Sequence, residues 1–310
     1  MTGALPACFS VEFECYKMGI TGSIVDVLDQ WKRFDHTTVV KLHVLHCPDL
    51  EIPAMFQEFI RLREIWIYNS TIRDWGPDAA VTNSCHPNLT VLSMIRINMT
   101  DGLLPLGLQS NDFPINLTQI TFCETNLRTL PDNIDEKWDV NASIYIENSQ
   151  LTSIPLSLIR LQPNSLSLAG NPIKVLPRQL FETSAIQHVT LSYTNVNELP
   201  REVTFSTMII DVSGTKISFF WSWIDLFVER QVEGTPNIIA SGTPYCADLE
   251  KIVNGLASDF SEAFHPGYSK FLVNAAETNW HFLRQAIDCA TLTPTKFPIK
   301  SWDTKYGMTP

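Results

Sequence analysis

The stretch LREIWIYNSTI (Leu62–Ile72) returns in altered form as LTQITFCETNL (Leu117–Leu127) and IQHVTLSYTNV (Ile186–Val196). Each copy follows the pattern L-x-x-L-x-L-x-x-[N/C/S/T]-x-L, which recurs every 21 to 28 residues along most of the chain. Three copies run into an apolar-x-x-apolar-Pro ending, as TNLRTLP, SQLTSIP and TNVNELP. Self-similarity at this period is typical of a solenoid of stacked repeats, so the repeat decides the fold before any local argument.

Positions 4 and 6 of the pattern are apolar and alternate with residues of other kinds, as on a short β-strand with one buried face. A single strand of this kind cannot bury its apolar face alone, whereas stacked neighbours form a continuous core. The sequence therefore predicts a leucine-rich-repeat horseshoe, an α/β solenoid of eight to nine repeats with parallel strands on its concave face. The predicted core pairs are Leu42/Val44, Ile65/Ile67, Leu92/Met94, Ile120/Phe122, Ile144/Ile146, Leu166/Leu168, Val189/Leu191, Ile210/Val212 and, more weakly, Ile238/Ala240.

Position 9 marks the turn that follows each strand. Short polar side chains can bind buried backbone groups at such a bend. Ile97 breaks the rule, which predicts an irregular third repeat. The residues at position 9 are Cys47, Ser70, Ile97, Thr125, Ser149, Asn171, Thr194, Thr215 and Thr243.

We expect an N-terminal cap (1–37), the repeats (38–245), and a helical C-terminal cap with an irregular tail (246–310). The apolar run Ile217–Val228 predicts a helix on the convex side, and Thr291–Pro310 is expected to form the irregular tail. Helical spacing in ADLEKIVNGLASDF and NAAETNWHFLRQAIDCA predicts two cap helices. Their expected apolar residues are Leu249, Ile252, Val253, Leu256, Trp280, Leu283 and Ile287.

The composition, 45% hydrophobic and 18% charged, is that of a folded protein, and the net charge is −11. The sequence has no cluster of Lys and Arg that could neutralise a row of phosphates, so we expect no nucleic-acid or anionic-membrane partner. The most apolar run is too short to span a bilayer and contains Asp225, so we expect no membrane insertion by this chain. The start MTGALPACFS lacks the features of a secretory signal, which fits an intracellular protein, a late gene start or one portion of a longer chain.

Seven cysteines are present, and four of them flank the repeats, where secreted solenoids of this class place disulfides. We expect bridges between Cys246 and Cys289 and between Cys8 and Cys15. Unrelated thiols in a reducing compartment are the alternative. The odd count leaves at least one cysteine without an intrachain partner.

The other three cysteines lie within the repeats. Cys47, at position 9, is expected to be a buried thiol. Cys123 occupies a strand position that should face solvent, where it could bond to Cys85 or stay free. Five N-x-[S/T] sequons on strand flanks and turns indicate candidate glycosylation sites and an extracellular location, at Asn69, Asn88, Asn98, Asn116 and Asn141.

In a horseshoe, positions 3, 5, 7 and 8 line the concave face. The first five repeats place large side chains there, whereas later repeats carry mainly small ones. Exposed Trp and Tyr residues are typical of binding hot spots. A glycan on Asn69 would lie beside this surface and could block it. We predict a ligand-binding surface formed by His43, Trp66, Tyr68, Ile95, Tyr145 and Glu147.

We find no sequence motif of a catalytic site or phosphate loop, so we expect no enzyme and no cofactor. His43 and His46 are expected to face solvent on the first strand, away from Cys47, and we predict no metal site. His265 and His281 have no partner at ligand spacing.

Five segments, HCPDLEIP, IYNSTIRDW, FCETNLRTLPDNID, LSLAGNPI and SGTPYC, resemble an oomycete family of large membrane-associated leucine-rich-repeat proteins. The resemblance covers roughly residues 8–290. In that family a multi-pass membrane region precedes a repeat ectodomain, so the resemblance implies a membrane-associated protein. This sequence departs from the family in lacking the membrane region, and the resemblance implies no particular ligand.

Two functions fit these features. The first is a non-enzymatic recognition module that binds a protein or peptide through its concave face, as an extracellular part of a membrane-associated or secreted protein. The second is an intracellular, cytoplasmic scaffold of the LxxLP type. Cap cysteines and sequons favour the first function, and the missing signal sequence favours the second.

Overall fold

The chain folds as two compact units in a computed structural model that describes residues 4–138, 141–183, 185–204, 209–230, 238–291 and 295–307. Unit 1 consists of Met1–Gln150, Pro155–Pro163 and Phe297–Pro310. Unit 2 consists of Leu151–Ile154 and Asn164–Lys296. The last residues of the chain therefore belong to the same unit as the first repeats.

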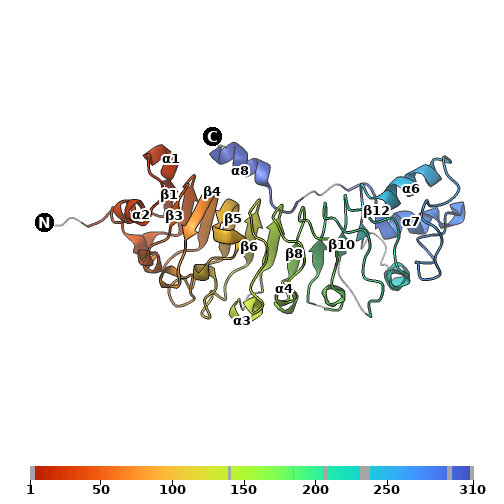
Figure 1. Ribbon diagram of the computed structural model, residues 1–310, viewed down its shortest axis with the longest axis horizontal. Coiled ribbons are helices and arrows are strands. Elements are labelled where there is room, and N and C mark those ends of the chain that lie inside the picture. The colour runs from red at the N-terminus through yellow and green to blue at the C-terminus, as the bar shows by residue number, and fades with distance from the viewer. Residues whose placement is uncertain are drawn as a thin grey trace. The chain divides into compact units, whose positions relative to one another are not determined.

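Unit 1 is built on parallel strands that follow one another in chain order (Figure 1). The register aligns equivalent pattern positions, so that Trp66 of one repeat lies between His43 and Ser93 of its neighbours. The strands are β1 (Ser10–Glu14), β2 (Lys41–Leu45), β4 (Glu64–Asp74), β5 (Val91–Met99), β6 (Gln119–Cys123) and β7 (Ser143–Glu147), with β3 (Leu50–Glu51) beside the end of β4.

Unit 2 repeats this arrangement with shorter strands, all parallel. The strands are β8 (Ser165–Ser167), β9 (His188–Thr190), β10 (Ile209–Asp211), β11 (Ile238–Ile239) and β12 (Ile287–Asp288). Its helices α5 (Asp225–Arg230), α6 (Pro244–Val253) and α7 (Trp280–Ala286) follow the later repeats.

The predicted core pairs are buried in both units, with at most 2% of any of these side chains exposed. Because the strands stack in register, each apolar pair lies beside the pairs of the neighbouring repeats and forms a continuous core with them. This arrangement confirms the leucine-rich-repeat α/β solenoid.

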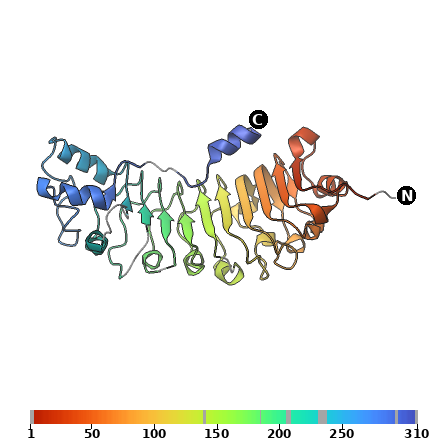
Figure 2. The ribbon, with the colours of Figure 1, turned by 180° about the vertical axis from the view of Figure 1, so that it is seen from behind.

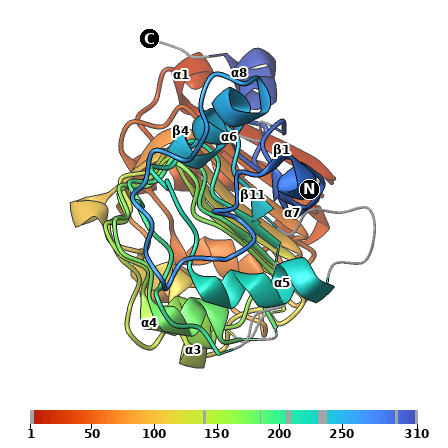
Figure 3. The ribbon, with the colours of Figure 1, turned by 90° about the vertical axis from the view of Figure 1, so that its right-hand side faces the viewer.

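Short helical segments lie between successive strands in the chain, on the side of the repeats away from the strands. In unit 1, α3 (Ile134–Lys137) and α4 (Leu156–Arg160) lie away from the C-terminal helix α8 (Ile299–Tyr306), as Figures 1 and 3 show. Proline stands directly before several of these segments, where its missing N–H costs no helical hydrogen bond. These segments include η2 (Ala54–Glu58), η5 (Leu106–Leu108), α4 and η6 (Arg178–Phe181), which follow Pro53, Pro105, Pro155 and Pro177.

The turn after each strand has a constant geometry. At position 9 the side chain binds backbone groups, as where Thr125 and Ser149 hydrogen-bond to each other and Ser149 donates to the carbonyl of Glu147. At Ile97 this bonding is absent, and Asn126 of the next repeat instead binds both the N–H and the carbonyl of Met99 at 2.8 Å.

Position 8 adopts a left-handed backbone in every repeat, with φ between 45° and 71°. Glycine reaches this conformation without strain and asparagine tolerates it, whereas most other residues lose about 1 kcal/mol or more in it. The residues concerned are His46, Asn69, Arg96, Glu124, Asn148, Gly170, Tyr193, Gly214 and Gly242.

The disulfides match the sequence-based expectation in one case and correct it in the other. Cys246 is bonded to Cys289 in unit 2, as expected. Cys15 is bonded to Cys47 and not to Cys8, so the expectation of a free thiol at Cys47 was wrong as well. The reason is that β1 pairs with β2, which places the residues following the two strands side by side. Strand β1 separates Cys8 from Cys15 by about 15 Å or more, and Cys8, Cys85 and Cys123 are free.

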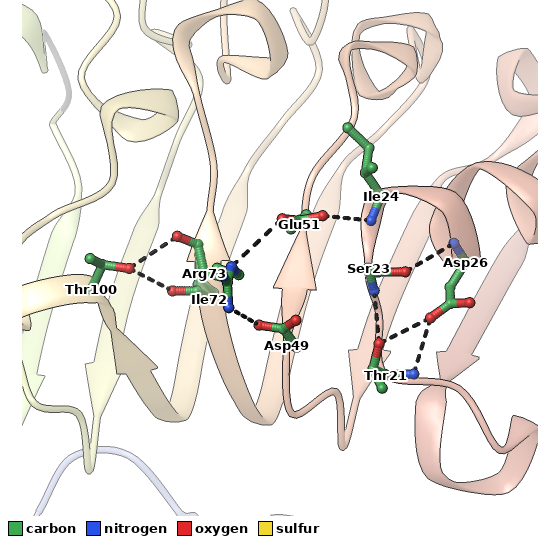
Figure 4. A network of polar contacts seen from close by, with 9 residues as sticks. All are labelled: Thr21, Ser23, Ile24, Asp26, Asp49, Glu51, Ile72, Arg73 and Thr100. Carbon is green, nitrogen blue, oxygen red and sulfur yellow. Dashed lines mark hydrogen bonds and ion pairs between the residues drawn. The ribbon is translucent and has the colours of Figure 1, made fainter.

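The N-terminal cap also contains α1 (Cys15–Met18), α2 (Ile24–Trp31) and η1 (His36–Thr38). A polar network links α2 to the second and third repeats (Figure 4). Glu51 accepts the N–H of Ile24 at 2.8 Å, and Arg73 contacts Asp49 at 3.2 Å. Thr100 donates to the carbonyl of Arg73 at 3.0 Å. Such exposed contacts contribute little individually.

The C-terminal region differs from expectation at four points. Ile287 lies in strand β12, which adds to the sheet, and not on a helix. Leu256 follows the end of α6 and is 78% exposed, so it belongs to no apolar helix face. The run 217–228 turns helical only from η7 (Ser222–Ile224) onward. The stretch expected to be an irregular tail contains α8 (Ile299–Tyr306).

The other short segments are η3 (Pro77–Ala79), η4 (Thr100–Gly102) and η8 (Glu277–Asn279). Among the helices in the described ranges, none combines the length and apolar character needed to cross a bilayer.

Candidate functional site

Helix α8 lies on the strand face of unit 1, which we define as the side chains at positions 5 and 7 of β2, β4, β5, β6 and β7. Figures 1 and 2 show α8 at the edge of the sheet where β4 and β5 end. Phe297, just before the helix, is buried in an apolar cluster with Leu45, Tyr68, Ile95 and Cys123. A segment from the end of the chain thus completes the surface of the first repeats. Trp66 of the strand face packs against this cluster together with Ile299, Trp302 and Tyr306.

Aromatic rings carry much of this contact. The rings of Trp66 and Trp302 stack with centroids 4.2 Å apart and planes inclined by 21°. The ring of Tyr306 lies 5.9 Å from that of Tyr68 and meets the ring of His43 edge-on at 6.1 Å. Such pairs add about 0.5–1.5 kcal/mol each beyond the burial of their surface.

Asp303 provides the polar anchor of α8. The hydroxyl of Tyr68 donates to Asp303 Oδ1 at 2.7 Å, and Arg96 Nη2 lies 3.0 Å from Oδ2. Arg96 also reaches Glu124, with Nε 3.0 Å from Oε2. Burial, and next the bond to Asp303, raise the pKa of Tyr68 far above its usual value, so this hydroxyl remains a donor. Charge-assisted bonds of this kind are among the stronger polar contacts in proteins.

Three further contacts involve side chains of β2, of the turn that follows β2, and of β7. The backbone N–H of Phe297 donates to the carboxylate of Glu147 at 2.9 Å. His43 Nδ1 lies 3.2 Å from the hydroxyl of Tyr306, and His46 Nε2 lies 3.3 Å from the carbonyl of that residue. The strand face therefore holds α8 through both side-chain and backbone groups.

The structure brings most of the predicted ligand-binding residues together, but it does not leave them open to solvent. Tyr68, Ile95 and Glu147 are fully buried, and His43 is 8% exposed. Trp66 and Tyr145 remain partly exposed. The expectation of an exposed aromatic cluster was wrong because α8 covers it.

Two further expectations about this face are corrected for the same reason. His46 was expected to face solvent and is 6% exposed, and Cys123 was expected at a solvent-facing position and is fully buried. Burial, followed by the charge of Glu147, raises the pKa of the Cys123 thiol well above its usual range.

The sequence-based prediction missed the partners on both sides of this contact. Arg96 and Glu124 were not selected, although position 8 was assigned to the concave face, because the prediction named only large side chains at positions 5 and 7. The last residues were interpreted as a tail. A signal was present, since Ile299, Trp302 and Tyr306 are spaced as one face of a helix.

A polar groove of about 760 Å³ runs along the turns at the ends of the strands, and its lining includes His46, Arg96 and Glu124. Asn69 lies in this groove and its amide is 2.9 Å from His46 Nδ1. Asn69 is only partly exposed, whereas the other sequon residues are exposed: Asn88, Asn98, Asn116 and Asn141.

His265 and His281, the two histidines of the C-terminal region, contact aromatic rings of that region. His265 Nδ1 accepts the N–H of Gly267 at 2.9 Å, and its ring packs against Trp221 and Tyr268. The ring of His281 lies 5.9 Å from that of Phe282.

The fold is similar to that of solved structures of low sequence identity. One is a leucine-rich-repeat protein of Leptospira interrogans, with a TM-score of 0.46 and 14% identity over 67% of this chain and 56% of that chain. Another is InlP of Listeria monocytogenes, with a TM-score of 0.49 and 16% identity over 69% and 58%. A third is a chain of the Toll–Spatzle complex of Drosophila, with a TM-score of 0.49 and 16% identity over 66% of this chain and 27% of that chain.

The match spans less than two thirds of the length of each of these three structures. The amino-acid sequence matches no family model and no curated protein.

Removing one ring of the Trp66–Trp302 stack should release α8 while leaving the repeats folded. We expect Trp66→Ala and Trp302→Ala each to speed the labelling of Cys123 by a thiol reagent by about two- to tenfold, the range set by a stacked aromatic pair. The measurement uses chains in which Cys8 and Cys85 are replaced by serine.

The effect of the double variant should be smaller than the sum of the two single effects, because both single variants remove the same Trp66–Trp302 stack. Phe264→Ala, which removes a ring that is 78% exposed in unit 2, is the matched control. Loss of the folded state on Trp66→Ala would instead make this ring part of the core.

Acidification should weaken the docking of α8 through His43. Burial, followed by the charge of Lys305, holds the pKa of His43 below its usual 6.5; Glu12 and Glu64 oppose this shift and Lys41 adds to it. The undocked state therefore binds a proton more readily than the docked state. The contribution of neutral His43 to docking is therefore complete above about pH 6.5. It is lost as the pH falls through the lower pKa that His43 has in the docked state.

The test is the rate of Cys123 labelling by a disulfide reagent that works in acid, divided at each pH by the rate for His43→Gln. This ratio cancels the intrinsic pH dependence of the thiol and should rise as the pH falls from 7.5 to 5. A flat ratio would contradict a role for His43.

Proposed function

We propose that this protein is a non-enzymatic recognition module that binds a protein or peptide through the strand face of unit 1. One observation carries this proposal: that face already holds a polypeptide segment, α8 with the preceding Phe297, by a stacked tryptophan pair, a charged anchor at Asp303 and bonds to the backbone of the segment. A surface that binds one helix in this manner has the chemistry to bind another.

The rigidity of the scaffold supports the same function. His43, Trp66 and Tyr145 come from different strands of one hydrogen-bonded sheet, which fixes their spacing. A preformed surface of this kind avoids much of the ordering cost that weakens association. The proposed mechanism is therefore surface complementarity, with no bond made or broken.

An extracellular or membrane-associated location is part of the proposal. Two disulfides, Cys15–Cys47 and Cys246–Cys289, are supporting features, because such bonds persist mainly in oxidising compartments. The four exposed sequon asparagines add to this support, since glycan acceptors must lie on the surface.

Peptide mapping of the protein from its native source, alkylated without reduction, tests the location. We expect both disulfides to be intact, and glycans on exposed acceptors such as Asn88 or Asn98 but not on Asn69. Seven alkylated thiols and bare asparagines would contradict an extracellular location and favour the intracellular scaffold.

Selection from a displayed peptide library tests the recognition function. The target is the opened chain, which we define as the full chain carrying Trp302→Ala, Asp303→Ala and Tyr306→Ala. We expect peptides that bind this chain and lose about tenfold or more in affinity when Trp66→Ala is added, because a central aromatic residue carries a large share of such binding.

The matched control adds Phe264→Ala in place of Trp66→Ala and should leave binding unchanged. If no selected peptide responds to Trp66→Ala, the strand face is not a recognition surface.

A further inference from the structure

We propose that the partner of the strand face is a helix presenting an aromatic residue, a carboxylate one residue later and a second aromatic residue four positions after the first. We also propose that α8 is an internal competitor for that partner. This inference rests on the proposed function and specifies its ligand. In α8 the three positions are Trp302, Asp303 and Tyr306.

Each of the three positions meets a matching group on the strand face. Trp302 stacks on Trp66, and Asp303 lies between the hydroxyl of Tyr68 and the guanidinium of Arg96. Tyr306 meets the edge of the His43 ring. The face therefore selects for the chemistry and the spacing of three side chains, which a helix can place on one side.

Among the described residues, the opposite side of α8 packs against no apolar residue of the strand face, although the charge of Lys305 acts on His43. Lys300, Ser301, Thr304 and Lys305 are exposed, and no residue of the helix is fully buried. A core element of a solenoid has its apolar positions fully covered, as at Leu168 and Phe122. Helix α8 instead has the exposure pattern of a ligand seated on a surface.

The length of α8 makes its docking reversible. It has eight residues, and isolated helices shorter than about 12 residues are marginal in water. The helix therefore exists because the strand face holds it, and it unfolds when it leaves. Docking is coupled to folding, which lowers the net affinity and allows another helix to replace it.

The composition of the strand face explains why it needs an occupant. Without α8, the cluster of Leu45, Tyr68, Ile95 and Cys123 would be open to water beside Trp66. A large exposed apolar patch favours association and aggregation. An internal occupant keeps the face covered until a partner of the same chemistry arrives, and the tether gives that occupant an effective concentration in about the millimolar range.

The decisive measurement is the affinity of a synthetic peptide of residues 295–307 for the opened chain and for the wild-type chain. We expect the peptide to bind the opened chain at least about tenfold more tightly. In the wild-type chain α8 covers the strand face, so only a fraction of the molecules can bind the peptide. Its binding should also slow the labelling of Cys123, which reports coverage of the strand face.

A charge exchange tests the pattern itself. Arg96→Glu in the opened chain should weaken binding of the peptide by tenfold or more, and a peptide carrying Asp303→Arg should regain most of that loss. Arg73→Glu is the matched control, since Arg73 contacts Asp49 and Glu51 (Figure 4), away from α8. Arg73→Glu should leave unchanged the affinity of the opened chain for the unmodified peptide and for the peptide carrying Asp303→Arg.

The outcomes separate this inference from the proposed function. If library peptides bind in a manner that depends on Trp66, but the 295–307 peptide does not bind and the selected sequences lack the aromatic–acid–aromatic spacing, the inference is overturned and the recognition function stands. If neither kind of peptide binds the opened chain, both are overturned. Labelling of Cys123 only on global unfolding would make α8 a fixed part of unit 1 and overturn the inference as well.

Discussion

The left-handed residue at position 8 of every repeat is the constraint on which the rest of the structure depends. It bends the backbone out of each strand, so that the position-9 side chain turns inward and binds the buried backbone groups. In unit 2 glycine fills most of these positions, at Gly170, Gly214 and Gly242. In unit 1 all five are occupied by other residues. Two of them are asparagines, which tolerate this φ, whereas the other three hold it at a cost of about 1 kcal/mol or more each.

The side chains at these strained positions contribute to the contact at the strand face. His46 and Arg96, both at position 8 of unit 1, contact the docked helix α8, and Glu124, at the same position, pairs with Arg96. Glycine there would relax the turn but would remove these side chains. Backbone strain concentrates where function requires it, and here it marks the repeats that carry the proposed recognition surface.

The repeat allowed much of the fold to be predicted from the sequence, because its period and polarity are local properties. The alignment of His43 with Trp66 and the buried turn residues such as Thr125 follow directly from it. The end strands did not, because β1 and β12 lack the pattern and form only by pairing with a neighbouring strand. The Cys15–Cys47 bond depends on that pairing, so spacing alone pointed to the wrong partner.

The site shows the same division between local and long-range information. A sequence pattern placed Trp66 and Tyr68 on one face, and their large size indicated binding. Its occupant came from the other end of the chain, and no local rule connects Trp302 with Trp66. However, an aromatic-rich face cannot remain open to water without cost. The same pattern that predicts such a face therefore also predicts a cover for it, and an amphipathic segment elsewhere in the chain is the first place to search for that cover.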